Sequence, residues 1–198
     1  MDKIKEILIA TNNEGKYREI SDLITHKVKK HSPKTFNLST PEENGKSFEE
    51  NSFIKASYFS KKTNLISLSD DSGLEIDILD GEPGIYSSRW SGEKNNFNLA
   101  IEKIFKKMNK VKGKWSEKNK AKFVCCLTLF WPNGKSYTSK GIIKGKILNI
   151  KKGQNGFGYD PIFIPEKHKY TFGEMSPNLK ISIDHRYEAF KKIKKFFI

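Results

Sequence analysis

The sequence lacks the apolar segments that mark membrane and secreted proteins. None of its apolar runs approaches the ~20 residues of a membrane span, and the longest covers residues 124–131. The N-terminus reaches charged residues at once and has no apolar signal-peptide core. We therefore expect a soluble, cytoplasmic protein with no membrane partner.

Cysteine is scarce as well. The only two, Cys125 and Cys126, are adjacent in a strand-like run, where successive side chains point to opposite faces. Neither belongs to a CxxC pair of the kind that zinc sites use. We expect both to be buried, reduced core residues.

Arginine is rare although the chain is strongly basic. Lysine and arginine total 37 and give a net charge of +14, but only Arg18, Arg89 and Arg186 are arginine. The lysines are scattered and no known nucleic-acid-binding motif is present, so we expect no nucleic-acid partner. A basic surface would still attract a polyanion such as a nucleotide. A non-catalytic basic RNA-binding module is kept as one alternative function.

Internal repeats and linkers rich in Pro, Gly or Ser are also missing, so the 198 residues predict a single domain. Strand and helix patterns alternate, which predicts an α/β fold on one mixed sheet. The predicted elements are a strand at 4–10, a helix at 16–24, a helix capped by Ser47 and Glu50 that ends near Lys62, a helix at 96–108, a mobile loop at 106–122, a hairpin at 121–150 and an amphipathic helix at 184–197.

An acidic segment follows one predicted strand. After apolar residues 65–68 come Asp70, Asp71, Ser72 and Gly73, which predict a turn that presents two carboxylates and a hydroxyl to a ligand. Such a pair of carboxylates can hold a divalent metal and activate a water. The same residue types are common in simple turns, so a purely structural role is the alternative.

A polar cluster lies between the first predicted strand and helix. It consists of Thr11, Asn12, Asn13, Glu14, Gly15 and Lys16. It is not a Walker A motif, because Ala10 and Tyr17 stand where that motif needs Gly and Ser or Thr. The turn and the helix start nevertheless place backbone N–H groups and the Lys16 ammonium on one anion. The alternative is a turn that only caps the helix.

Three further clusters sit at comparable positions. Glu42 and Glu43 precede a turn, residues 153–161 combine glycines with two aromatics that could stack on a base, and His185 with Arg186 opens the last predicted helix. The glycine spacing of 153–161 excludes a dinucleotide-binding fingerprint. Each cluster also has a structural explanation: a solvated acidic loop, a tight hairpin loop and surface helix residues.

Together these clusters resemble the inosine triphosphate pyrophosphatase family, which acts on non-canonical purine nucleoside triphosphates, in order and spacing from Ile7 to about Ile193. The resemblance implies an elongated, twisted mixed sheet with flanking helices that form two lobes around a central nucleotide-binding cleft. It also implies a homodimer that uses Mg²⁺ to hydrolyse ITP, dITP and XTP to the monophosphate and pyrophosphate. A pyrophosphatase for modified pyrimidine nucleotides is the second alternative.

The resemblance further implies residue roles. Asp71 would be general base and metal ligand, and Glu43 the second metal ligand. Loop 11–16, Lys55 and Ser72 would bind phosphates. The remaining substrate contacts would come from Phe157, Gly158, Tyr159, Asp160, Lys180, His185 and Arg186, the last two on the purine ring. The chain departs from the family pattern at Asp184, usually Ser, and at Gly173, usually Ala, which leaves the tuning of base recognition open.

Overall fold

The structure is a computed structural model that describes residues 3–92 and 96–197. The chain forms two compact units, each assembled from separate stretches of sequence. Unit 1 comprises Met1–Asp71, Cys125–Gly141 and His185–Ile198, and unit 2 comprises Ser72–Val124 and Ile142–Asp184. Because the chain passes back and forth between the units, no single linker separates them in the sequence.

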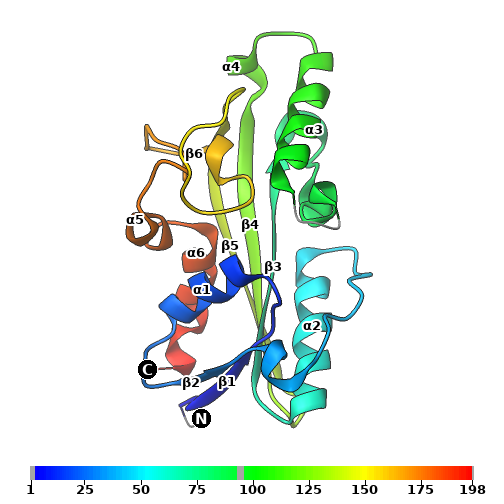
Figure 1. The fold of residues 1–198 in the computed structure, drawn as a ribbon, viewed down its shortest axis with the longest axis vertical. Coiled ribbons are helices and arrows are strands. Elements are labelled where there is room, and N and C mark those ends of the chain that lie inside the picture. The colour runs from blue at the N-terminus through cyan, green and yellow to red at the C-terminus, as the bar shows by residue number, and fades with distance from the viewer. Residues whose placement is uncertain (1–2, 93–95, 198) are drawn as a thin grey trace. The chain divides into compact units, whose positions relative to one another are not determined.

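Strands and helices alternate as the sequence predicted (Figure 1). The strands are β1 (Glu6–Ile9), β2 (Lys29–His31), β3 (Ser67–Ile76), β4 (Lys120–Phe130), β5 (Ser136–Ile147) and β6 (Phe163–Pro165). The α-helices are α1 (Glu14–Leu23), α2 (Phe48–Thr63), α3 (Phe97–Lys110), α4 (Trp115–Lys118), α5 (Pro177–Ile181) and α6 (His185–Ile193). Short 3₁₀ helices form at Pro33–Phe36, Asp77–Leu79, Gly84–Tyr86, Arg89–Ser91, Asp160–Ile162 and Lys194–Phe196.

The strands form one six-stranded sheet in the order β2-β1-β3-β4-β5-β6. β1 runs parallel to β2 and to β3, whereas β5 and β6 are antiparallel, so the predicted mixed α/β sheet is confirmed. The predicted hairpin is β4 and β5, whose turn is closed by the Trp131 N–H and the Lys135 carbonyl at 2.9 Å. In the described part of the chain, no helix is long and apolar enough to cross a membrane.

Within unit 1, helices cover both faces of the sheet. Ile7 of β1 packs with Ile20 of α1 and Phe190 of α6. The next residue, Leu8, points to the opposite face and packs against Phe59 of α2. Because side chains of a strand alternate, α1 and α6 lie on one face and α2 on the other (Figure 1).

Unit 2 has a core of its own that is rich in aromatic rings. The ring of Phe163 lies 4.7 Å from that of Phe123 and 5.4 Å from that of Phe172, measured between centroids. Ile101 and Ile104 of α3 are buried in the same core, as their helical spacing in the sequence predicted.

The predicted turn at Gly73 is wrong. β3 runs unbroken over Ser67–Ile76 and includes Asp70, Asp71 and Gly73. Leu74 is fully buried, so the alternating packing of the strand continues past the glycine. The turn preference of Asp, Ser and Gly is a local bias, and pairing with the neighbouring strands overrides it here.

The mobile loop predicted at 106–122 is also wrong. Most of this stretch is regular structure, because α3 continues to Lys110, α4 follows and β4 begins at Lys120. The rings of Phe105 and Trp115 meet edge to face at 5.8 Å and tie α4 to α3. The high lysine content of the stretch concealed these two anchors.

The predicted helix ends are largely confirmed. Ser47 caps α2, accepting the Glu50 N–H at 3.1 Å, while the Glu50 carboxylate accepts the N–H of Lys46 at 2.7 Å instead of that of Ser47. The last helix is shorter than predicted, because His185–Ile193 is followed by a 3₁₀ turn at Lys194–Phe196.

Candidate active site

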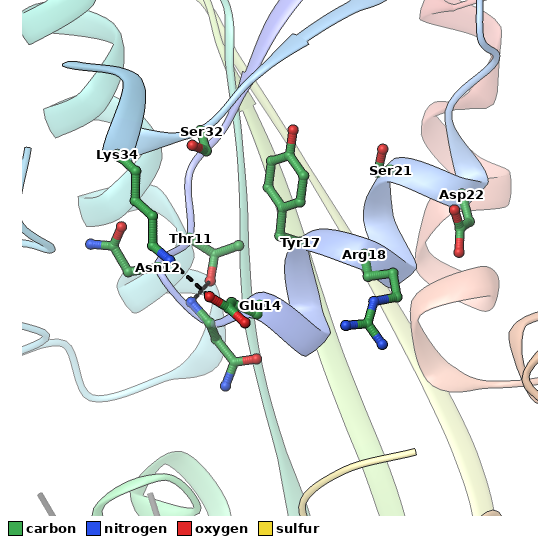
Figure 2. Close-up of a pocket in the computed structure, with 10 residues that line it drawn as sticks. Thr11, Asn12, Glu14, Tyr17, Arg18, Ser21, Asp22, Ser32 and Lys34 are labelled. Carbon is green, nitrogen blue, oxygen red and sulfur yellow. Dashed lines mark hydrogen bonds and ion pairs between the residues drawn. The ribbon is translucent and has the colours of Figure 1, made fainter. Parts of the chain in front are cut away.

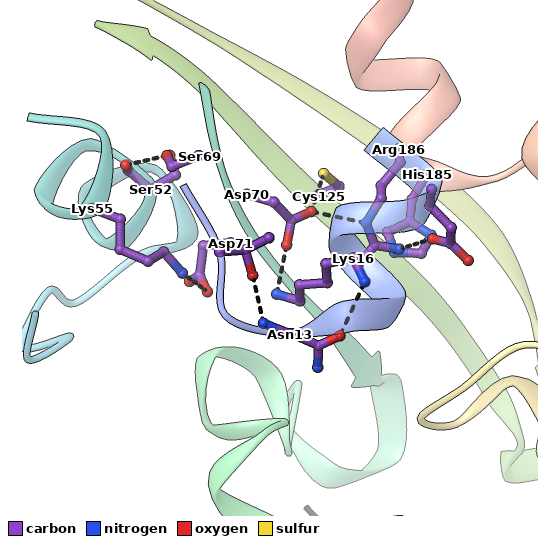
Figure 3. Close-up of polar contacts among 12 residues, drawn as sticks. Asn13, Lys16, Ser52, Lys55, Ser69, Asp70, Asp71, Cys125, His185 and Arg186 are labelled. Atoms are coloured by element: carbon purple, nitrogen blue, oxygen red, sulfur yellow. Dashed lines mark hydrogen bonds and ion pairs between the residues drawn. The ribbon is translucent and has the colours of Figure 1, made fainter. Parts of the chain in front are cut away.

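The two adjacent aspartates of β3 serve opposite faces of the sheet in unit 1. Asp70 points toward Lys16 and Arg186 (Figure 3), whereas Asp71 forms an ion pair with Lys55 of α2. Ser69 follows the same alternation and donates its hydroxyl to a carbonyl of α2. One strand therefore supplies a carboxylate to each of two polar clusters.

Asp70 is the centre of the first cluster. Its Oδ1 lies 2.5 Å from the Lys16 ammonium, and its Oδ2 lies 3.0 Å from Arg186 Nε. The Cys125 thiol donates to Oδ2 at 3.1 Å, and Arg186 also pairs with Glu19 of α1 at 2.7 Å. The negative charges of Asp70 and Glu19 thus balance the positive charges of Lys16 and Arg186. The Asp70 side chain has no exposed surface.

The charges of this cluster fix the protonation of Asp70. Burial alone would raise the pKa of its carboxyl, but the nearby Arg186 and Lys16 charges lower that pKa far below its usual range. Burial and the Asp70 charge in turn raise the pKa of the Cys125 thiol, which stays protonated and donates. Cys126 lies on the opposite face beside Glu49 of α2, so the predicted burial of both cysteines on opposite faces is confirmed.

Asp71, Lys55 and Glu43 form the second cluster. The Lys55 ammonium lies 2.5 Å from Glu43 Oε1 and 3.3 Å from Asp71 Oδ1. The side chains of Lys55 and Asp71 are 5% and 6% exposed, and that of Glu43 is 22% exposed. The structure therefore brings together the predicted base, the second predicted metal ligand and the predicted phosphate-binding lysine.

The environment of Asp71 suits a general base. Burial raises the pKa of its carboxyl, and the charges of Glu43 and Asp70 add to this effect, although Lys55 and Lys16 act against it. For Lys55, burial alone would lower the pKa, but the charges of Asp71 and Glu43 raise it. A carboxylate with a raised pKa is a better proton acceptor than an ordinary one.

The same carboxylates fit a magnesium ion. Asp71 Oδ2 is buried and has no hydrogen-bond partner among the residues described, so it can accept a ligand. Across the described parts of the chain, no three His, Cys, Asp or Glu side chains gather into a metal-binding group. A pair such as Glu43 and Asp71 would suit Mg²⁺, because this ion keeps several waters and shares substrate phosphates.

The polar loop before α1 is held in one conformation by its own side chains. Asn13 caps α1, accepting the Lys16 N–H at 3.0 Å, while Thr11 Oγ1 accepts the Asn13 N–H at 3.1 Å. Asn12 Nδ2 donates to Thr40 Oγ1 at 2.9 Å. The capping role and the predicted anion-binding geometry therefore coexist, because the cap leaves the helix N-terminus and Lys16 in place.

A pocket of about 460 Å³ lies beside this loop (Figure 2). It is lined by Thr11, Asn12, Asn13, Glu14, Tyr17, Arg18, Ser21, Asp22, Ser32 and Lys34. Glu14 faces Lys34 at 2.8 Å, with both side chains largely exposed, so this predicted substrate residue forms a surface ion pair. The lining residues do not include Asp70, Asp71 or Lys55, so this pocket does not coincide with either carboxylate cluster.

A third group of predicted residues lies within unit 2. The Lys180 ammonium is 2.7 Å from Asp160 Oδ2 and 4.9 Å from the centre of the Phe157 ring. The same Oδ2 accepts the Phe157 N–H at 2.8 Å. Asp160 thereby fixes both the backbone at Phe157 and the ammonium that faces its ring.

Close packing explains the glycines of this loop. At Gly156, with φ of +73°, an added Cβ would lie 2.0 Å from Asp160 Oδ2. At Gly173, where the family usually has Ala, a Cβ would lie 2.6 Å from the Lys152 carbonyl oxygen and 2.8 Å from Pro161 Cα. Gly173 therefore allows a close approach of the backbone at Lys152 and Pro161 that an alanine side chain would obstruct.

Tyr159 differs from its predicted role as a stacking residue. Its side chain is buried in the unit 2 core, where it meets the Phe97 ring at 5.3 Å and donates its hydroxyl to the Ser87 carbonyl at 2.8 Å. Burial raises the pKa of its phenol. Tyr159 thus anchors the loop from beneath, and Phe157 is the aromatic residue left as the stacking candidate. Gly158, which lies between Phe157 and Tyr159 in the sequence, has a φ of +68°.

His185 and Arg186 open α6 as predicted, but both are buried rather than on the surface. Arg186 Nη1 lies 3.3 Å from His185 Nε2, which acts as the acceptor. Gly141 of β5 permits this placement, because an added Cβ would lie 2.1 Å from the His185 carbonyl oxygen. Asp184 is also buried, and its effect on base recognition stays a prediction.

Some contacts could not be predicted from the motifs. Glu19 and Cys125 complete the Asp70 cluster, yet neither belongs to a motif. The most useful signal is burial of lysine, since Lys55 and Lys180 are the only buried lysines in the described residues. Ser72 follows Asp71 in β3 and is half-buried, and its phosphate contact stays a prediction.

Comparisons with known proteins identify relatives of this chain. The Ham1 family matches residues 7–196. A dITP/XTP pyrophosphatase of Zymomonas mobilis is 40% identical over 94% of this chain and 89% of its own length, and one of Bacillus cereus is 39% identical over 98% and 96%.

Solved structures agree as well. The Ham1 protein of Staphylococcus aureus has a TM-score of 0.84 and 36% identity, covering 97% of both chains, and that of Coxiella burnetii has a TM-score of 0.86 and 33% identity, covering 97% of this chain and 98% of its own. The match therefore extends over the sheet, the helices and every cluster described above, and the chain belongs to the Ham1 family.

Proposed function

We propose that this protein hydrolyses deaminated purine nucleoside triphosphates, namely ITP, dITP and XTP, to the monophosphate and pyrophosphate. The observation that carries the proposal is the buried cluster of Asp71, Lys55 and Glu43, found in a chain whose relatives are named dITP/XTP pyrophosphatases. It combines a carboxylate of raised pKa with a lysine suited to phosphate.

Asp71 is the base in this proposal. Its buried Oδ2 accepts a proton from a water, which attacks one phosphorus of the triphosphate in line with the leaving group. Glu43 and Asp71 would hold Mg²⁺, which when bound neutralises phosphate charge. The protein's own part is to orient the water and to make Asp71 a stronger proton acceptor through its raised pKa.

Lys16 binds phosphate and Asp70 positions it. An ammonium has three N–H donors, and the contact of 2.5 Å to Asp70 aims Lys16 while leaving donors for the substrate. The capped start of α1 adds backbone N–H groups for the same anion. Asp70 therefore orients the phosphate-binding group without touching the reacting atoms.

Base recognition is assigned to Phe157, Lys180, His185 and Arg186. The Phe157 ring offers a stacking face, and Arg186 is a donor suited to the six-position carbonyl of hypoxanthine and xanthine. Lys180 and Arg186 are buried beside carboxylates and His185 is buried beside Arg186, so these side chains are held in defined positions.

We also propose a cytoplasmic homodimer, from the family resemblance. Sedimentation velocity of the purified protein measures the mass directly. A single species at the mass of one 22.8 kDa chain at micromolar concentration would reject the dimer.

A substrate panel tests the proposed reaction. Initial rates with Mg²⁺ should favour ITP, dITP and XTP over ATP, GTP, CTP and UTP. Asp71→Asn should lower kcat by a factor of ~10²–10⁴, because it removes the proton acceptor. Asp77→Asn, at an exposed position six residues along the chain, is the control and should keep full activity. A preference for modified pyrimidine triphosphates would favour the alternative function, and full activity of Asp71→Asn would remove the assigned base.

A further inference from the structure

Lys55 occupies the place of a cation within the predicted metal site. Its ammonium lies between the two carboxylates, 2.5 Å from Glu43 and 3.3 Å from Asp71, and its side chain is only 5% exposed. These are the same two side chains that would ligate Mg²⁺. A divalent ion held by both carboxylates would share them with the Lys55 ammonium, and the two positive charges would repel each other.

We infer that Lys55 is the resident counter-ion of the metal site, which must leave the two carboxylates before a divalent metal can enter. This inference rests on the proposed function, since it takes Glu43 and Asp71 as metal ligands. It assigns Lys55 two successive partners: the carboxylates in the free protein and the phosphates in the complex.

The charge of the cluster explains why the exchange needs the nucleotide. With Lys55 in place, the cluster carries two negative charges and one positive charge. Free Mg²⁺ would have to displace an ammonium whose ion-pair partners among the described residues are these two carboxylates. A triphosphate supplies that anion, so the metal should enter together with the nucleotide and only weakly by itself.

The surroundings allow the side chain to move while its helix stays fixed. Ser52, one turn before Lys55, bonds to Thr128 of β4 at 2.6 Å and accepts a hydrogen bond from Ser69 of β3. These contacts tie α2 to the strands. Lysine has a flexible four-carbon stem with three rotatable donors, so its ammonium can change partner by rotamer alone.

The test measures metal affinity of the free protein, without substrate. Mn²⁺ binding is followed by electron paramagnetic resonance, and Mg²⁺ binding by competition, for wild type, Lys55→Met and Lys61→Met. Lys61 is an exposed residue in the last turn of the same helix and serves as the matched control. Lys55→Met should bind metal more tightly than wild type by about tenfold or more, because the competing charge is gone. Lys61→Met should match wild type.

A second variant keeps the test decisive if Lys55→Met folds poorly. Lys55→Gln keeps a polar group, and it should show a gain of the same sign. Adding Asp71→Asn to either variant should abolish the gain, which separates a metal at this site from metal elsewhere. In wild type, a non-hydrolysable ITP analogue should tighten Mn²⁺ binding.

The outcomes separate this inference from the proposed function. Equal or weaker metal binding by both Lys55 variants overturns the counter-ion role, whether or not wild type hydrolyses ITP. Tighter binding by these variants supports it, and in that case failure of wild type to hydrolyse ITP would reject the substrate assignment alone.

Discussion

Asp70 and Asp71 are neighbours in sequence with opposite electrostatic environments. Asp70 has two bases against its carboxylate, which lower its pKa, whereas burial dominates at Asp71 and raises its pKa. The alternation of β3 produces this difference, because it sends one side chain to α1 and α6 and the other to α2. Two identical side chains thereby differ in pKa, and Asp71 is the one better suited to accept a proton.

The lowered pKa of Asp70 predicts how its contribution to stability depends on pH. A carboxylate with a depressed folded pKa stabilises the fold above its unfolded pKa of about 3.9, and the stabilisation is lost as pH falls toward the folded value. Asp70→Asn removes the negative charge that faces Lys16 and Arg186. It should lower the free energy of unfolding by about 3–5 kcal/mol at pH 7. Urea unfolding of both proteins from pH 3 to pH 7 measures the difference. It should shrink below about pH 4, and a constant difference down to pH 3 would show that the Asp70 charge is not responsible.

Arg186 should set the preference between bases. Hypoxanthine presents a carbonyl acceptor where adenine presents an amino donor, and an arginine can only donate. Arg186→Ala should therefore lower kcat/KM for ITP more than for ATP, by roughly 5- to 150-fold in the ratio. Because Arg186 also balances Asp70 and Glu19, the variant should be less stable, but a ratio measured on one preparation does not depend on the folded fraction. An unchanged ratio would move base discrimination to residues 157–160.

At the scale of elements, the loop between β5 and β6 depends on Gly156. Gly156 and Gly134 both have positive φ, so alanine at either position should cost about 1–2 kcal/mol through the backbone. Only at Gly156 would the new Cβ meet a side chain, that of Asp160, whereas nothing lies within 4 Å at Gly134. Gly156→Ala should therefore lose more stability than Gly134→Ala and also raise KM for ITP. Equal stability losses and an unchanged KM would show that the Asp160 contact does not shape the site.

The elements were predictable where local pattern and tertiary packing agree. The strand at β1, the Ser47 cap of α2 and the hairpin of β4 and β5 follow from periodicity and turn residues. The path of β3 through Gly73 did not, because neighbouring strands impose it and the local residues favour a turn. Helix α4 was missed because the high lysine content of this stretch gives no sign of the ring contact between Phe105 and Trp115.

The site was predictable as a set of residues but not as a set of contacts. The motifs supplied Lys16, Glu43 and Asp71, and the structure places each beside an opposite charge. A single sequence gives no pairing information, so the link from Asp70 to Cys125 could not be read from it. The central cleft and the phosphate contacts stay predictions.

At the scale of the whole molecule, the net charge of +14 supports binding of a polyanion without identifying it. The buried lysines distinguish a site from a merely basic surface, because Lys55 and Lys180 each face a carboxylate in a defined geometry. An RNA-binding module would use exposed lysines and need neither. In the proposed function, the positive charge would attract the nucleotide and the buried clusters would carry out the reaction.

The phosphorus product of ITP hydrolysis tests the central claim most directly. Phosphorus NMR of the wild-type reaction with Mg²⁺ should show IMP and pyrophosphate appearing together in equal amounts, with no IDP at any time, because one in-line attack divides the triphosphate once. Stepwise release of orthophosphate with accumulation of IDP would contradict the account and place this protein in another class of nucleotide hydrolase.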